Sequence, residues 1–333
     1  MTGPSLRRRE CLSLIGGLAV GWTLPAFAQE QRRYRIGSLS LAGPDDHPPP
    51  LPANWNGFVQ GLRENGFEEP RNIEFEHRSA HHEPALFPRA AAELVGTSVD
   101  VIFARGTWAI AAARNATGTI PIVGIDLESD PVEAGLVASI ARPGGNITGL
   151  FLDLSELSGK HLEILREIIP DLSHVAVMGD ATVNAPQLRE LETVARSLGL
   201  QMKTLETAAE HLDSAVRMAK TWQAQAVIVL SSPLTMAYRA RIADLVAAAR
   251  LPSMYLYRAH VLAGGLISYG PDLPDMFRRC GVYVSRIING TKPGDLPIER
   301  PTRFELLINI KVAKNLGITV PESILIRADE VIE

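Results

Sequence analysis

Two short loops carry the residues whose types and spacing favour binding of an anion. Arg105-Gly106-Thr107-Trp108 follows the apolar run Val99–Ala104, and Asp126–Asp130 follows the apolar run Ile120–Ile125. Short runs rich in Val and Ile are typical of strands buried on both faces of a parallel sheet. Ligands of such sheets bind outside the carboxyl ends of the strands. Both loops are therefore candidates for one binding crevice, or else ordinary turns between strand and helix.

Each loop is also predicted to begin a helix. Thr107 is the expected N-cap of an Ala-rich helix, and Asp130-Pro131-Val132-Glu133 combines a capping Asp with Pro at the first helical position. A helix N-terminus offers free N–H groups and positive partial charge. The pair of helices therefore predicts a site for a carboxylate.

The chain around these loops alternates strands and helices. A first strand over Tyr34–Leu41 brings Ser38 and Ser40 to the same edge as the two loops. A second alternating series runs from Ile147 to Tyr269. Such alternation predicts an α/β fold with two Rossmann-like, doubly wound sheets. The strand ends of the second series offer Asp180, Ser231-Ser232-Pro233, Tyr255 and Tyr257.

The C-terminal part predicts a return of the chain to its first lobe. After Tyr269 the regular alternation stops, and a helix near residues 276–289 precedes one more strand near 304–308. We therefore expect lobe 1 to comprise residues 29–147 plus about 271–305, and lobe 2 to comprise 148–270 plus about 306–333. A ragged C-terminal subdomain is the alternative.

The first 28 residues have the pattern of an export signal. Arg7-Arg8-Arg9 precedes the apolar run Leu14–Leu24, and Pro25-Ala26-Phe27-Ala28 supplies small residues for cleavage. Consecutive arginines favour the twin-arginine route, although Cys11 stands where an aromatic residue is commoner. Cleavage removes three of the 33 basic and one of the 37 acidic side chains, which leaves a formal charge of −6. That charge disfavours nucleic acid and anionic membranes as partners.

Motifs of common enzymes and cofactor sites are absent from the sequence. Neither a Walker-type Gly-Lys-Ser/Thr, nor Gly-x-Gly-x-x-Gly after a strand, nor His-Glu-x-x-His, nor Gly-x-Ser-x-Gly occurs. A metal site at His77, His81 and His82 lacks a supporting Cys or carboxylate cluster. Cys280 is the one cysteine left after cleavage, and its predicted amphipathic helix disfavours a reactive thiol. We therefore expect no enzyme, no cofactor and no metal.

Several motifs follow one another over almost the whole chain. They are Arg-Arg-Glu with Leu-Ser-Leu-Ile-Gly-Gly near the start, Gly106-Thr107, Asp130–Val137, Ala141–Gly149, Ser268-Tyr269-Gly270, Pro301–Leu306 and Arg327–Ile332. The run Ala141–Gly149 is the most specific of them. In this combination the chain resembles the substrate-binding proteins of ABC importers, a family that includes tryptophan- and tyrosine-binding members.

The resemblance implies a type I periplasmic-binding-protein fold, in which two lobes joined by hinge strands trap a ligand between them. It also implies that hydroxyls and main-chain N–H groups of the first lobe hold a ligand carboxylate. The candidate ligand-binding residues are Ser40, Arg105, Gly106, Thr107, Trp108, Asp126, Ser129 and Asp130 in the first lobe, with Asp180, Ser232, Tyr257 and Tyr269 from the rest of the chain.

Two candidates depart from the family pattern. Arg105 and Trp108 stand where smaller residues are common in relatives, so the expected pocket is narrower. In one interpretation Arg105 binds a carboxylate through two hydrogen bonds and Trp108 stacks on the ligand. In the other, Arg105 pairs with Asp126 or Glu128, and Trp108 packs against the Pro-rich loop at residues 43–52.

The functional expectation is a monomeric, periplasmic solute-binding protein without a cofactor. It would deliver a small carboxylate-bearing or amino-acid-like solute to an ABC permease in the inner membrane. A ligand-sensing protein that signals to a membrane receptor shares every feature named so far. A periplasmic enzyme is a third reading, since distant loops can assemble a catalytic pair without a local motif.

Overall fold

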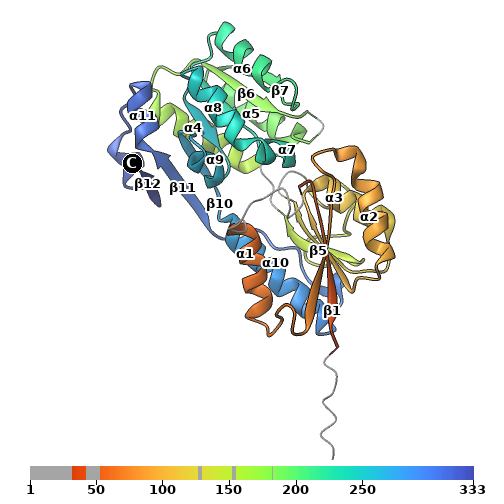
Figure 1. The fold of residues 1–333 in the computed structure, drawn as a ribbon. Helices are drawn as coiled ribbons and strands as arrows, with labels where there is room; N and C mark the ends of the chain where they lie inside the picture. Colours follow the sequence, from red (N-terminus) through yellow and green to blue (C-terminus); the bar gives the residue numbers. More distant parts are fainter. Residues whose placement is uncertain (1–31, 43–52, 127–129, 152–154, 182) are drawn as a thin grey trace, which may run out of the picture. The chain divides into compact units, whose positions relative to one another are not determined.

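The computed structural model describes residues 32–42, 53–126, 130–151, 155–181 and 183–333. This part of the chain forms two β-sheets made mostly of parallel strands, with helices packed on their faces (Figure 1). The predicted α/β class with two doubly wound sheets is therefore confirmed.

The first sheet contains five parallel strands in the order β2-β1-β3-β4-β5. Its strands are β1 (Tyr34–Ser40), β2 (Ile73–Ser79), β3 (Val101–Arg105), β4 (Ile122–Asp126) and β5 (Ile147–Phe151). Its helices are α1 (Ala53–Arg63), η2 (Pro84–Leu86), α2 (Phe87–Gly96), α3 (Thr107–Ala116) and α10 (Leu273–Ile288).

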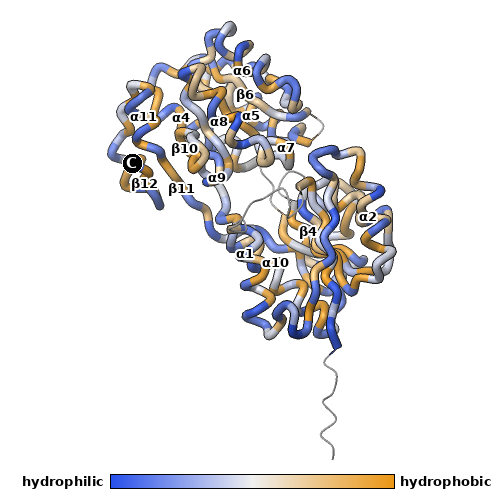
Figure 2. The backbone as a smooth tube through the Cα atoms, in the orientation of Figure 1, coloured by the Kyte–Doolittle hydropathy of each residue, from blue (hydrophilic) through white to orange (hydrophobic). Residues whose placement is uncertain are grey.

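Side-chain alternation along the strands assigns each helix to a face of the first sheet. Val101 and Phe103 belong to the apolar cluster that contains α1 and α10. Ile102 and Ala104, one position along, belong to the cluster of α2 and α3. Every second residue of a strand points to the same face, so a continuous apolar run is buried on both sides. Figure 2 shows hydrophobic residues along the strands around β4.

The second sheet contains seven strands in the order β12-β11-β10-β9-β8-β6-β7, and β11 is antiparallel to β10. The strands are β6 (His174–Gly179), β7 (Gln201–Glu206), β8 (Ala226–Val229), β9 (Ser253–Tyr255), β10 (Ile267–Pro271), β11 (Phe304–Asn309) and β12 (Glu330–Ile332). Helix α4 (Ser155–Ile168) precedes β6, and a short η3 (Pro293–Asp295) precedes β11. The helices that follow the strands of this sheet are α5 (Ala185–Ser197), α6 (Leu212–Thr221), α7 (Pro233–Ala237), α8 (Arg239–Ala248), α9 (Arg258–Leu262), α11 (Ile310–Leu316) and α12 (Glu322–Leu325).

The two sheets share one strand order. In the second sheet, β7-β6-β8-β9-β10 repeats the order β2-β1-β3-β4-β5 of the first. In this order the direction of winding reverses between β1 and β3, and again between β6 and β8. Ligands of doubly wound sheets bind at such switch points, beyond the carboxyl ends of the strands.

The chain passes between the sheets at several points. Strand β5 pairs with β4, so the chain leaves the first sheet after Phe151. The chain leaves the second sheet after Pro271, adds α10 to the cluster of the first sheet, and returns to the second sheet at Phe304. At the exit and return points, the Asp272 N–H donates to the Arg303 carbonyl at 3.1 Å.

Helices α1 and α10 cross at glycines. A Cβ atom added to Gly61 would lie 1.9 Å from the Arg278 carbonyl oxygen, and one added to Gly57 would lie 2.3 Å from the Pro274 carbonyl oxygen. Gly281 of α10 makes the matching approach to the Phe58 carbonyl oxygen, at 2.3 Å from its added Cβ. The missing side chains let the two backbones touch.

The helix expected after Asp130 does not form. Asp130 Oδ1 accepts hydrogen bonds from the N–H groups of Val132 and Glu133 at 2.7 and 2.9 Å, as a helix cap would. Gly135 then adopts φ +63°, and Leu136 N–H bonds back to the Pro131 carbonyl. Residues 130–146 therefore form turns, and the prediction of a second helix N-terminus at this edge is wrong.

Three smaller differences concern element ends. The N-cap of α3 is Gly106 and not Thr107, which is the first helical residue. The helical segment after β8 is divided at Tyr238 into α7 and α8. The sequence pattern also misses α9, α12 and β12, which are too short to show a period.

Candidate functional site

Polar side chains of β1 and β3 meet at the switch point of the first sheet. Nη2 of Arg105 donates to the Ser40 hydroxyl in a close contact and lies 3.5 Å from the Ser38 hydroxyl. The Ser40 hydroxyl in turn donates a hydrogen bond to the Ala42 carbonyl at 2.6 Å. The structure thus brings together Ser40 and Arg105, two of the expected binding residues.

Arg105 keeps its positive charge in this setting. The partly buried side chain has a buried Nε with no hydrogen-bond partner, and its Cζ lies 5.6 Å from the Trp55 ring centroid. Burial lowers the pKa of Arg105 to about 10, so the guanidinium is cationic at neutral pH. It forms no ion pair with the described carboxylates; the side chains of Asp126 and Glu128 lie outside the described residues.

The turn into α3 places a helix N-terminus beside Arg105. Gly106 adopts φ +87°, which only glycine adopts without strain, and its N–H donates to the Ile125 carbonyl at 2.8 Å. The Gly106 N–H is therefore already used within the fold. Thr107 and Trp108 begin the helix, and the half-buried Trp108 packs on the cluster of α2 and α3.

The second expected loop contributes less to the described structure. Asp130 uses its carboxylate to hold its own turn. Ser129 and the side chain of Asp126 lie outside the described residues.

A buried Asn joins the strand ends at the switch point of the second sheet. Asn184 Oδ1 accepts from the Asp180 N–H at 3.0 Å, and its Nδ2 donates to the Ser231 carbonyl at 2.8 Å and to Gln187 Oε1 at 2.6 Å. Asn184 is 0% exposed, and it links the ends of β6 and β8. The sequence pattern missed this residue; an Asn just before Ala-Pro at a helix start was the available signal.

The remaining expected residues have structural contacts of their own. Ser232 forms a capping box with Thr235, in which its Oγ accepts from the Thr235 N–H at 3.1 Å and its own N–H donates to Thr235 Oγ1. Tyr257 is buried in the apolar cluster of α1 and α10. The Tyr269 carbonyl accepts a hydrogen bond from His161 Nε2 at 2.7 Å. The Tyr269 ring stacks on Phe304, with ring centroids 6.1 Å apart.

Two buried histidines predict how stability depends on pH. Burial lowers the pKa of His161 and of His260 from 6.5 to about 4. Between pH 6.5 and 4 the unfolded chain binds these protons and the folded chain does not, so stability falls as the pH falls, by roughly 1 kcal/mol per pH unit for each histidine. Urea unfolding at several pH values should show a shallower fall for His161→Gln, whose amide can still donate to Tyr269. His211→Gln, at an exposed position, should keep the wild-type slope; a His161→Gln slope equal to it would contradict the assignment.

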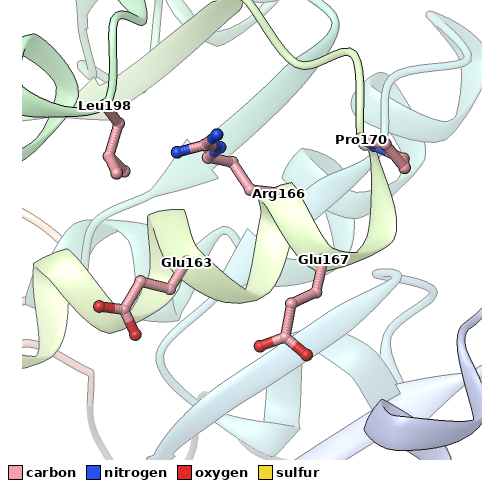
Figure 3. Close-up of a pocket in the computed structure, with 5 residues that line it drawn as sticks. All are labelled: Glu163, Arg166, Glu167, Pro170 and Leu198. Carbon is pink, nitrogen blue, oxygen red and sulfur yellow. The ribbon is translucent and has the colours of Figure 1, made fainter.

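The pocket drawn in Figure 3 is separate from these residues. It lies along α4 and is lined by Glu163, Arg166, Glu167, Pro170 and Leu198. Lys160 already pairs with Glu163 at 2.8 Å, and Arg327 holds both carboxylate oxygens of Glu167 at 3.0 and 3.1 Å. Its carboxylates therefore have partners within the chain.

Neither a metal-binding cluster nor a membrane-spanning helix occurs among the described residues. Among them, no three His, Cys, Asp or Glu side chains gather closely enough to hold a metal ion. Within the same residues, every helix is too short or too polar to cross a bilayer.

Comparisons with known proteins agree on one family. A model described as ABC transporter substrate binding protein matches residues 46–332. A tyrosine-binding protein of Clostridioides difficile (strain R20291) is 26% identical over 290 residues, which cover 86% of this chain and 81% of the relative. A conserved domain protein from Vibrio cholerae has a crystal structure that is 29% identical, with a TM-score of 0.81 over 90% of this chain and 99% of that one.

A third comparison concerns the fold alone. The crystal structure of an ABC domain in complex with L-Trp from Streptococcus pneumonia is 23% identical and has a TM-score of 0.80 over 90% of this chain and all of that one. This similarity concerns the fold, which in the present chain consists of two sheets with the same strand order. From the family match over residues 46–332, this chain belongs to the ABC transporter substrate-binding proteins and has their type I periplasmic-binding-protein fold.

Proposed function

We propose that this protein is the solute-binding component of an ABC importer and holds a small amino-acid-like ligand by its carboxylate. Family membership supports the class of function. The observation that carries the ligand chemistry is Arg105, a partly buried cation whose hydrogen-bond partners in the described structure are hydroxyl groups.

An anion accounts for Arg105 better than a neutral ligand does. A buried charge without a counter-ion is costly, and neutral hydroxyls offset only part of that cost. A carboxylate meets a guanidinium through two parallel hydrogen bonds, which are about twice as strong as neutral ones. The N-terminus of α3 adds positive partial charge at the same sheet edge. The β1/β3 switch point is where ligands of this strand order bind.

Relatives support an amino acid with an aromatic side chain. One relative is named for binding tyrosine, and one similar structure holds L-Trp. In this chain the Asn184-linked strand ends and Tyr269 are the proposed contacts for the rest of the ligand, with the lobes following the two sheets. Closure of the lobes on the ligand then requires that the closed state bind it more tightly than the open state.

Calorimetric titration with matched compounds tests this function. L-tyrosine and L-tryptophan should bind, whereas tyramine and tryptamine, which lack only the carboxylate, should bind at least 100-fold more weakly because Arg105 is left without its anion. Mass spectrometry after incubation should recover the amino acid unchanged, since no reaction is expected. Equal binding of L-tyrosine and tyramine would overturn the proposal, and conversion of the ligand would favour an enzyme.

We also propose export through residues 1–28 and delivery to an inner-membrane permease. The basis is the consecutive arginines, the apolar run and the small residues before Gln29. Mass spectrometry of the secreted protein should give an N-terminus at Gln29, and Arg8→Lys with Arg9→Lys should retain the precursor in the cytoplasm. An intact N-terminus on the exported protein would exclude cleavage.

A further inference from the structure

An aromatic ring of α1 lies against the guanidinium of Arg105. The Arg105 Cζ is 5.6 Å from the Trp55 ring centroid, a cation–π distance. The residues come from different elements, α1 and β3, so the contact depends on the tertiary fold. Trp55 was not among the binding residues expected from the sequence.

Trp55 is itself held firmly by other rings. Its centroid lies 5.1 Å from each of Phe58, Phe75 and His77, at interplanar angles of 37°, 66° and 58°. The Trp55 residue is 8% exposed, so it belongs to the core and offers little surface to a ligand. Trp55 therefore acts on the site through its contact with Arg105.

The guanidinium is therefore constrained on two sides. The indole lies along one side, and the Ser40 and Ser38 hydroxyls engage Nη2. Nε is buried without a hydrogen-bond partner. A bidentate carboxylate commonly uses two adjacent N–H groups of one edge, and a fixed plane lowers the entropy lost when they bind.

We propose that Trp55 is a positioning residue that fixes the plane of Arg105 so that its Nε edge binds the ligand carboxylate. This inference rests on the proposed function, because it assumes that Arg105 binds a carboxylate. It adds a determinant of selectivity for carboxylates that lies outside the binding surface. Loss of the indole should loosen Arg105 and reduce discrimination between a carboxylate and a neutral amide.

The test compares L-tyrosine with L-tyrosinamide, which differ only in charge and shape at the carboxylate. For each variant, calorimetry gives the dissociation constant of L-tyrosinamide divided by that of L-tyrosine, and a high ratio means a strong preference for the carboxylate. Trp55→Leu, which keeps apolar volume but removes the π face, should lower this ratio about tenfold. Trp55→Phe, which keeps a π face, should restore most of it. Phe277→Leu is the matched control, because Phe277 packs edge to face on Phe103 at 5.5 Å in the same cluster and is not one of the three rings around Trp55. It should lower stability without changing the ratio.

The outcomes separate this inference from the function beneath it. If wild-type protein binds L-tyrosine no better than L-tyrosinamide, carboxylate recognition itself fails. If wild type discriminates and Arg105→Gln does not, yet Trp55→Leu keeps the wild-type ratio, only the role of Trp55 is overturned. If Trp55 has a purely structural role, Trp55→Leu should weaken binding of both compounds equally, as Phe277→Leu does, and that result would also overturn the inference.

Discussion

Replacing Arg105 by Gln is expected to weaken binding of L-tyrosine by at least 100-fold. The change removes two charge-assisted hydrogen bonds to the carboxylate, each worth roughly 1.5–3 kcal/mol, and every 1.4 kcal/mol is a factor of ten in affinity. Arg105→Lys keeps the charge but loses the planar fork, so it should recover only part of the affinity. Isothermal titration calorimetry at fixed ionic strength measures all three proteins.

The unliganded stability of the same variant separates the two interpretations of Arg105. If the guanidinium lacks a counter-ion until the ligand arrives, Arg105→Gln should leave the free energy of unfolding unchanged or raise it. If it pairs with Asp126 or Glu128, the variant should lose about 3 kcal/mol, because a carboxylate is left unpaired. Arg89→Gln, at an exposed residue of α2, controls for loss of a surface charge. Unchanged ligand binding in Arg105→Gln would remove Arg105 from the site.

Adding one methyl group at Gly61 is expected to cost about 3 kcal/mol of folding stability. The Gly61 Cβ would lie 1.9 Å from the Arg278 carbonyl oxygen, and neither backbone can yield without moving a helix. Overpacking of a close contact typically costs 1–3 kcal/mol, and this contact is backbone on backbone. Urea unfolding of Gly61→Ala should show a lower midpoint at an unchanged m-value.

Gly96 of α2 provides the control for that experiment. Nothing lies within 4 Å of an added Cβ at Gly96, so Gly96→Ala gains helix propensity without a clash. It should stabilise the protein by roughly 0.5–1 kcal/mol. Equal effects of Gly61→Ala and Gly96→Ala would show that α1 and α10 do not touch in solution.

The local sequence pattern is sufficient to predict a strand where that strand is buried on both faces of a sheet. The run Val99–Ala104 predicts β3 because its residues 101–104 pack alternately into the two apolar clusters that cover the faces of the sheet. Local pattern fails at Asp130, since an N-cap and an isolated turn use the same carboxylate hydrogen bonds. The choice between them depends on Gly135 at φ +63° and on the Ala138 N–H bonding to the Pro143 carbonyl. Neither the conformation of Gly135 nor the Ala138 hydrogen bond can be inferred from a capping residue at Asp130.

The site was predictable in part for the same reason. Arg105 could be selected because it ends a buried strand, and position along the strand fixes its edge of the sheet. Trp55 could not, because it acts through a contact with another element of the fold. The position of Asn184 before Ala-Pro marks a helix start, but it does not reveal the contact with the Ser231 carbonyl. Such partners are set by packing of whole elements, for which the sequence holds no local signal.

The late position of α10 has a consequence for how this protein is made. Its Arg278 Nη1 meets Glu64 Oε2 at 3.0 Å across 214 positions of sequence, and α10 fills one face of the first sheet with Phe277, Cys280 and Val284. A nascent chain on the ribosome cannot complete that core until α10 has emerged, and the second sheet in turn needs β11 and β12, which follow α10. Domains usually fold in the order of synthesis. Here both sheets should acquire protection from hydrogen exchange only when the last fifth of the chain has been made, instead of the N-terminal sheet folding first.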